Sequence, residues 1–388
     1  MAAGTSVSIP RQNTSSRSFT VFACGLFVLL GIVTTLLGPT LPLLATRWSI
    51  ATAEAGRLFF WQFAASTAGT LLSGFTLARR NFKIAILVGN ALCVAGVGAL
   101  AVSNWEMARA AVACFGFGLG IALPAINLAV AEANPEHRAA SVSLLNFSWG
   151  IGAIGCPLLL WATHNLNIFL WLVTLVVGVG WIASCFCRVP DGDRSATAIQ
   201  ATTLNRHTLT LAAILALLMF LFVGVENAVG GWAAALALPQ FSSAFTATFA
   251  NVAFWGFFLG SRALAPWLLR VIKEQQLMRA GIVVAIVGVT LFYFANGPAL
   301  VILACGLAGL GIGPGFPVLI SRVSALLGSH NPAATICFAF GGLGGAALPP
   351  LVGSVSARAG HAKAGLAIPI LALCALLMMS WRRRLEHV

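Results

Sequence analysis

Long apolar stretches separated by short polar ones run along the whole chain. A helix needs ~20 mostly apolar residues to cross the hydrocarbon core of a bilayer. Lipid offers no hydrogen-bond partners to the backbone, so helices, which satisfy their own N–H and C=O groups, are favoured as spanning segments. The pattern predicts twelve such helices, at 19–45, 56–78, 83–102, 107–133, 139–162, 167–187, 209–236, 245–269, 277–296, 298–320, 333–355 and 365–381.

The composition requires a surface covered by lipid. Of the 388 residues, 59% are hydrophobic and 8% are charged, whereas a soluble globular chain carries about 25% charged residues. So few charges exclude a soluble enzyme. With the N-terminus placed in the cytoplasm, 16 of the 22 Lys and Arg residues fall on the cytoplasmic side of the predicted spans and 5 on the other side. This bias predicts that both termini are cytoplasmic, and it accounts for the net charge of +13 without a nucleic-acid partner.

The second half of the chain repeats the first at an offset close to half its length. Matches occur in order along four helix pairs. They are Phe60-Trp61 with Phe254-Trp255, Gly31 and Gly38 with Gly224 and Gly231, Gly118-Leu119-Gly120-Ile121 with Gly309-Leu310-Gly311-Ile312, and Gly150-x-Gly152 plus Pro157 with Gly342-x-Gly344 plus Pro349.

Two bundles of six helices follow from this repeat. We expect an N-terminal bundle at 1–187, a polar cytoplasmic linker at 188–208 and a C-terminal bundle at 209–388. Because six is even, both bundles share one membrane orientation and are related by a pseudo-twofold axis along the membrane normal. Solute sites in such folds lie near the midplane between the halves, and rocking of the halves gives alternating access.

The loop after the second span carries a recognisable motif. Gly74, Arg79 and Lys83 stand at the glycine and basic positions of the Gly-x-x-x-Asp-Arg-x-Gly-Arg-Arg signature, with Ala78 at the Asp position. With twelve helices as six plus six, the chain resembles the major facilitator superfamily. The resemblance implies a transporter, and it gives Arg79 a gating role.

Three further segments resemble the fucose-permease-like sugar group of that superfamily. They are Gly118-Leu119-Gly120-(x)6-Asn127, Asn146-Phe147-Ser148-Trp149-Gly150 and Gly224-Val225-Glu226-(x)3-Gly230-Gly231-Trp232. The chain departs from that group at two acidic positions, since Leu123 replaces a carboxylate and 19–45 contains no Asp or Glu. The resemblance implies a sugar as the solute.

Glu226 is the only acidic residue deep within a predicted span. Intramembrane carboxyl groups usually face a bundle interior or a watery cavity. Burial disfavours the charged form, so Glu226 could exchange a proton. We expect it to bind solute hydroxyls or a coupling ion, H⁺ or Na⁺; the alternative is a structural hydrogen bond between helices. Gly230 and Gly231, one turn further on, could let the helix bend as a gate.

Arg262 is the only basic residue deep within a span. Counted from the predicted cytoplasmic ends of their helices, Arg262 lies ~12 Å deep and Glu226 ~26 Å deep. Straight helices would therefore keep the two side chains apart. We expect Arg262 to anchor the helix or to pin the inner gate, or else to bind the solute.

Other polar and aromatic residues within the spans complete the candidate site. Depths counted in the same way from the cytoplasmic ends of the helices predict two layers of polar residues. The outer layer contains Gln62, Glu226, Asn227 and Asn251, and the inner layer contains Asn90, Asn127, Asn146 and Arg262. Amides can bind sugar hydroxyls or tie helices together. A solute could stack on Trp61, Trp149, Trp232 and Trp255, or these side chains could be packing or lipid-facing residues.

The sequence thus predicts a secondary active transporter of a small polar solute, a sugar, working by alternating access. An uncoupled facilitator, an exporter of amphipathic compounds and a transporter-like membrane sensor remain as alternatives. No catalytic, nucleotide-binding or metal-binding motif is visible, so we expect neither an enzyme nor a cofactor. We expect a monomer in a bacterial inner membrane.

Overall fold

The computed structural model describes residues 14–73, 81–189, 206–241, 243–327 and 332–381. All regular structure within these residues is helical. The α-helices of the first half are α1 (Thr14–Thr35), α2 (Leu37–Arg47), α3 (Thr52–Ala55), α4 (Leu58–Leu72), α6 (Phe82–Val102), α7 (Trp105–Ala133), α8 (Arg138–Thr163) and α9 (Leu166–Phe186). Those of the second half are α10 (Arg206–Phe241), α11 (Ala244–Leu268), α12 (Glu274–Phe294), α13 (Pro298–Ile312), α14 (Gly315–Leu327), α15 (Pro332–Ala359) and α16 (Ala367–Ser380).

Every predicted span coincides with a helix or a pair of helices, and the twelve-helix prediction is confirmed. Ten segments of the described chain are long and apolar enough to cross a membrane by themselves. Helices α4, described over 15 residues, and α15 complete the set of twelve. The long α10 and the paired α13 and α14 are among the ten spans.

Two of the predicted spans are broken in the middle. The first consists of α1 and α2, and the tenth consists of α13 and α14. Proline explains both breaks, because Pro39 has no N–H to donate to Thr35 and Pro317 has none to donate to Gly313.

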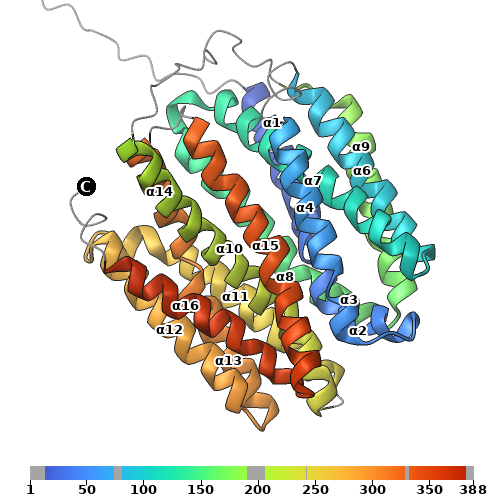
Figure 1. Ribbon diagram of the computed structural model, residues 1–388. Coiled ribbons are helices and arrows are strands. Elements are labelled where there is room, and N and C mark those ends of the chain that lie inside the picture. Colours follow the sequence, from blue (N-terminus) through green and yellow to red (C-terminus); the bar gives the residue numbers. More distant parts are fainter. Residues whose placement is uncertain (1–13, 74–80, 190–205, 242, 328–331, 382–388) are drawn as a thin grey trace, which may run out of the picture.

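The helices form two bundles that lie side by side, blue to green and yellow to red in Figure 1. In the first bundle α1 packs on α8, α4 on α7, and α6 on α7 and α9. In the second, α10 packs on α15, α11 on α13, and α12 on α13 and α16. Each pair in one bundle has its counterpart in the other, so the repeat in the sequence is also a repeat in packing.

Glycine contacts confirm the register of the repeat between helices α8 and α15. At Gly152 an added Cβ would collide with the backbone oxygen of Val28, and at Gly344 it would collide with that of Phe220. Both glycines bring a helix backbone against the first helix of their own bundle. The match of Gly152 with Gly344 is therefore also a match in three dimensions.

For α4 and α11 the sequence match is wrong by two residues. Gly116 approaches the backbone oxygen of Gln62, and Gly309 approaches that of Phe254. The contacts of Gly118 with α6 and of Gly311 with α12 make Gly309 the counterpart of Gly116. Gln62 and Phe254 are thus equivalent, so Trp61 and Trp255 are not. Their environments agree with this, because Trp61 is 40% exposed and Trp255 is 5% exposed.

The match between α7 and α13 has the same error. Gly118 lies against the backbone oxygen of Gly89, and Gly311 lies against that of Gly281. Gly118 is therefore equivalent to Gly311 and not to Gly309. Runs of alternate glycines allow both alignments, and only the helix–helix contacts distinguish them.

The two bundles meet along a seam made by a few helix pairs. Helix α4 packs on α15 and α8 packs on α11 near the middle, while α2 packs on α10 and α11, and α3 on α15. We call the end of the molecule that contains α3 the far end, and the end where α10 begins the linker end. Because α2 and α3 both bridge the seam, contact between the bundles continues to the far end.

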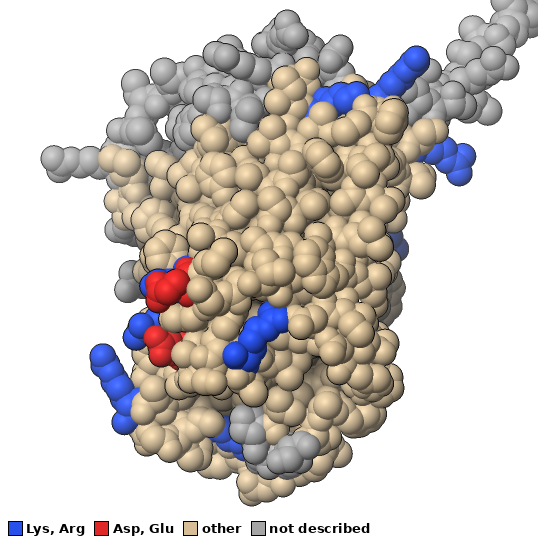
Figure 2. All heavy atoms as spheres, turned by 90° about the vertical axis from the view of Figure 1, so that its right-hand side faces the viewer, with Lys and Arg blue, Asp and Glu red and all other residues tan. Residues whose placement is uncertain are grey.

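Charged side chains are sparse on the outer face of the first bundle. Figure 2 shows a broad zone almost without them, with basic side chains above it and a mixed acidic and basic group below it. Such a zone suits the hydrocarbon of a bilayer. The predicted linker falls largely on residues 190–205, outside the described residues, and the predicted domain boundaries stay predictions.

Candidate solute-binding site

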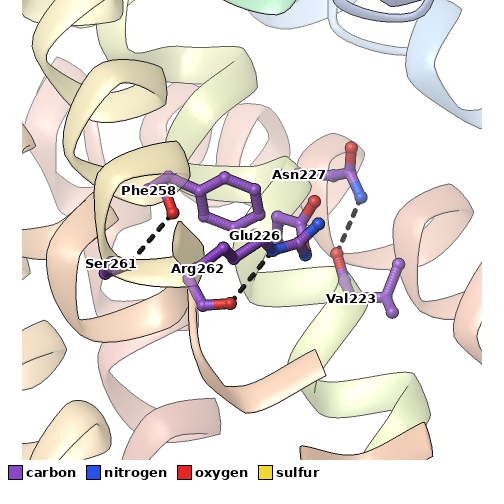
Figure 3. A network of polar contacts seen from close by, with 7 residues as sticks. Val223, Glu226, Asn227, Phe258, Ser261 and Arg262 are labelled. Carbon is purple, nitrogen blue, oxygen red and sulfur yellow. Dashed lines mark hydrogen bonds and ion pairs between the residues drawn. The ribbon is translucent and has the colours of Figure 1, made fainter. Parts of the chain in front are cut away.

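The centre of the second bundle holds an ion pair between Glu226 of α10 and Arg262 of α11. The Glu226 Oε2 and Arg262 Nη2 atoms are 3.6 Å apart, and Figure 3 shows the two side chains facing each other. Both are largely buried, with side chains 11% and 20% exposed, respectively. The expectation that these residues lie too far apart to pair is wrong.

The error comes from the choice of reference level. Glu226 lies 15 residues before the end of α10 at Phe241, and Arg262 lies 18 residues after the start of α11 at Ala244. Measured from this shared turn, their depths are ~22 and ~27 Å, which an arginine side chain can bridge. At the linker end α10 continues to Arg206 whereas α11 stops at Leu268, so depths counted from there are not comparable.

Arg262 makes three further contacts that fix its guanidinium group. Its Nε donates a hydrogen bond to the backbone oxygen of Gly313 at 3.0 Å. This oxygen is free because Pro317 cannot donate the helical bond. The guanidinium also lies 4.1 Å from the ring centre of Phe258 and 5.5 Å from that of Phe316, distances typical of cation–π contacts.

An aromatic column leads from this ion pair to the seam. Phe258 contacts Trp255 on the same face of α11, with ring centres 5.4 Å apart. Trp255 meets Trp149 of α8 edge to face at 5.6 Å, across the two bundles. Trp149 in turn donates from Nε1 to the Thr34 hydroxyl at 3.3 Å. Ring contacts therefore connect the ion pair with the first bundle.

Two buried amides beside the seam keep an oxygen without a protein partner. Gln62 donates from Nε2 to the Thr34 backbone oxygen at 2.7 Å, and Asn251 donates from Nδ2 to the Gly230 oxygen at 2.8 Å. The Gln62 Oε1 and Asn251 Oδ1 atoms are buried and accept no hydrogen bond from the protein. Such oxygens are costly to bury unpaired, so they are suited to a hydroxyl donor.

Three of the remaining amides are tied to nearby protein groups, whereas among the described residues the buried Asn90 has no hydrogen-bond partner for either its Nδ2 or its Oδ1 atom. Asn146, which is exposed, donates to Asn127 Oδ1 at 3.4 Å and to the Val142 oxygen at 2.8 Å. Asn227 donates to the Val223 oxygen at 2.8 Å. The layers are only partly as predicted, because Arg262, assigned to the inner layer, contacts Glu226 of the outer layer.

Trp232 and the two glycines before it pack tightly at the far end. Trp232 is buried, donates to the Pro349 oxygen at 2.8 Å, and lies against Gly56 of the first bundle and Gly353 of the second. Gly230 makes room for Trp255, and Gly231 for Phe59. Helix α10 is continuous through both glycines, so in this state they serve close packing rather than a bend.

Sequence reasoning missed four residues around the ion pair and the seam: Thr34, Phe258, Gly313 and Phe316. The rings resemble ordinary packing residues. Pro317, four residues after Gly313, was the available signal for a free backbone oxygen. Arg79 lies outside the described residues. Among the described residues, no group of three or more His, Cys, Asp or Glu side chains could hold a metal ion.

Comparison with known proteins agrees with this architecture. The family model described as Major Facilitator Superfamily matches residues 23–336, well over half of the chain. The glucose/mannose transporter GlcP of Bacillus subtilis (strain 168) is 22% identical over 355 residues, covering 86% of this chain and 86% of that protein.

Solved structures show the same fold at low sequence identity. The E. coli fucose:proton symporter FucP is 18% identical, with a TM-score of 0.62 over 94% of this chain and 98% of that one. A D-xylose-proton symporter is 16% identical, with a TM-score of 0.75 over 94% of this chain and 97% of that one.

Proposed function

The chain belongs to the Major Facilitator Superfamily, and we propose that it is a secondary active transporter that moves a sugar by alternating access, coupled to protons through Glu226. Its family and relatives are transporters and not enzymes, and it is a multi-pass membrane protein. The sugar, the coupling and the alternating access are the proposal, as are the bacterial inner membrane and the cytoplasmic termini.

The observation that carries the proposal is the ion pair of Glu226 and Arg262 joined by aromatic rings to the seam. An intramembrane ion pair is costly and marks a functional site by default. A pair that lies at the end of a column reaching the other bundle can respond to relative movement of the two bundles. This placement favours a role in transport over a purely structural one.

A neutral, hydroxyl-rich solute fits the groups along the seam. The buried oxygens of Gln62 and Asn251 can accept hydrogen bonds from hydroxyls. Trp149 offers a flat apolar surface of the kind on which sugar rings stack. Relatives described as glucose/mannose, fucose and xylose transporters support the same class of solute.

The chemistry of the ion pair supports proton coupling. When Glu226 takes up a proton its charge is lost, and Arg262 keeps only its contacts to Gly313 and the two phenylalanine rings. Arg262 can then bind a solute oxygen in place of the carboxylate. Proton binding and solute binding thus favour each other, as symport requires.

The arrangement of the seam fits one state of an alternating-access cycle. At the far end, α2 and α3 bridge to the second bundle. At the linker end, α14 packs mainly on α10 and α12 of its own bundle. We assign this structure to a state closed at the far end, which is the predicted extracellular side.

Flux measurements on purified protein in proteoliposomes test the proposal. A panel of radiolabelled sugars is first screened by counterflow, and accumulation is then measured with an imposed proton gradient or sodium gradient. We expect counterflow of at least one sugar, and accumulation driven by the proton gradient alone. Glu226→Gln should keep counterflow and lose accumulation, while Glu106→Gln, at an exposed acid of the far end, should retain both.

Three results would contradict parts of this proposal. The absence of counterflow with every sugar removes the sugar assignment. Accumulation driven by a sodium gradient alone excludes the proton as the coupling ion. A Glu226→Gln protein that still accumulates solute in a pH-dependent way shows that Glu226 has a structural role only.

A further inference from the structure

A cavity of about 590 Å³ opens at the far end of the seam, between α4 and α15. It is lined by Glu54, Arg57 and Trp61 of the first bundle and by Ala347 and Leu351 of the second, and Arg109 at the start of α7 completes its charged rim. Its volume lies in the range of ligand pockets, ~300–1,000 Å³. The transport proposal above uses none of these residues.

The lining changes from charged to apolar with depth. On α15 the wall runs from Ser354 to Ala347, seven residues or ~10 Å along the helix toward the membrane interior. On α4 it runs from Arg57 to Trp61, ~6 Å in the same direction. The charged groups thus lie at the rim, and aromatic and aliphatic side chains lie below them. A phospholipid has the same order, with its head group above its acyl chains.

The rim arginines are available to a ligand although each contacts a carboxylate. Arg57 is 4.0 Å from Glu54, with side chains 68% and 41% exposed, respectively. Arg109 pairs with Glu106, whose side chain is 69% exposed, and lies 5.9 Å from the ring centre of Trp105. Exposed ion pairs of this kind are weak and rearrange easily. The charged lining residues are two arginines and one acid, and the second acid, Glu106, pairs with Arg109 but is not in the lining.

We propose that this cavity binds an anionic phospholipid of the leaflet at the far end. Arg57 and Arg109 hold the phosphate, and an acyl chain lies along Trp61, Ala347 and Leu351. Tryptophan side chains are enriched at membrane–water interfaces, the level at which a head group lies. Because the cavity is formed by both bundles, a bound lipid bridges the seam and stabilises the state closed at the far end.

Binding is tested on the purified full-length chain in a neutral detergent. The probe is dihexanoyl phosphatidylglycerol, and the readout is the concentration dependence of the thermal unfolding temperature. Inorganic phosphate and an uncharged dihexanoyl glycerol serve as separate arms. We expect only the phospholipid to raise the unfolding temperature, with saturation.

Two variants address the two parts of the cavity. Arg57→Gln combined with Arg109→Gln should weaken the apparent affinity at least about tenfold, which corresponds to ~1.4 kcal/mol. Ala347→Phe, which fills the apolar part, should abolish the response while the rim stays intact. Arg358→Gln, at an exposed arginine of the far end outside the cavity, is the control and should respond as the parent chain does.

Each of the other outcomes overturns the proposal. An unchanged response in both cavity variants places the lipid elsewhere. An equal effect of inorganic phosphate indicates an anion site rather than a lipid site, and an equal effect of the uncharged glycerol shows that the arginines contribute nothing. A transported sugar that competes with the phospholipid assigns the cavity to the solute path.

Discussion

Arg262 is stabilised by partners from two helices and from a break between two others. Glu226 belongs to α10, Phe258 to α11, and Gly313 lies at the break between α13 and α14. A guanidinium group in hydrocarbon needs both a counter-charge and filled hydrogen-bond positions. The sequence showed each of these residues separately. It did not show that the Gly313 oxygen, which Pro317 leaves without its helical hydrogen bond, accepts one from a side chain 51 positions earlier.

The ion pair gives the first prediction at this scale. Arg262→Met leaves the buried Glu226 carboxylate without its partner, and breaking such a pair costs about 3–5 kcal/mol. We expect a clear fall in the thermal unfolding temperature and loss of counterflow. Adding Glu226→Gln should recover most of the unfolding temperature, because no uncompensated charge remains. A double variant as unstable as Arg262→Met would show that the two residues are not coupled.

The aromatic column gives the second prediction. Replacing Trp149 by Leu removes the ring that faces Trp255 and, in our proposal, the solute. An aromatic contact contributes about 0.5–1.5 kcal/mol beyond its area, so the sugar affinity should fall roughly three- to tenfold. Trp161→Leu is the control on the same helix, since that side chain is 41% exposed and faces Phe249. Equal affinities for the two variants would remove Trp149 from the site.

Helix α8 shows how element packing depends on single glycines. Gly152 lies directly against the backbone of α1, whereas Gly155, one turn further, has open space beside it. Close approach of two membrane helices requires small residues at the contact and nowhere else. The sequence therefore does not distinguish glycines that are needed for helix packing from glycines that contact nothing.

A pair of alanine variants separates these two kinds of glycine. Gly152→Ala places a methyl group into the α1 backbone, and we expect it to lower the unfolding temperature through overpacking of ~1–3 kcal/mol. Gly155→Ala should be neutral or stabilising by up to ~1 kcal/mol, because alanine favours the helix. The thermal unfolding of both proteins, measured side by side, checks this. Equal destabilisation would mean that α1 and α8 pack in another register.

At the scale of the whole molecule, the far end closes around Trp232. Gly56 from the first bundle and Gly353 from the second both lie against its ring, while its indole nitrogen donates to Pro349. The ring therefore fills the space between the bundles. If the bundles rock, this contact must open in every cycle.

A methyl group at Gly353 should bias the protein towards the opened far end, because the Cβ would lie 2.8 Å from the Trp232 ring. The readout is the labelling rate of an Ala55→Cys protein by a membrane-impermeant maleimide, above the background of the parent chain. Ala55 is buried in α3 at the seam. We expect Gly353→Ala to raise the rate severalfold, and Gly297→Ala, which has no neighbour within 4 Å, to leave it unchanged. An unchanged rate in Gly353→Ala would argue against opening at this contact.

Much of the fold was predictable because the bilayer restricts it so strongly. Twelve apolar stretches must become twelve helices in lipid, and the repeated glycines and prolines showed that the halves correspond. The register of three of the four helix pairs was not predictable. Two are shifted by two residues, and the contacts of Gly152 to Val28 and of Gly344 to Phe220 shift the match of Gly31 with Gly224 by one residue. Alternate glycines such as Gly116, Gly118 and Gly120 permit a shift of two residues, and only the contacts to Gln62 and Gly89 remove it.

The sequence by itself determined the membrane class, the number of helices, the family resemblance and the two rare intramembrane charges, because each depends on local composition or spacing. Only the tertiary structure decided that these two charges pair, that rings join them to the seam and that Trp232 fills the far end. Those facts depend on the relative level and tilt of helices, which local spacing leaves open by several ångströms. That uncertainty in position is larger than the difference in distance between two side chains that are in contact and two that are not.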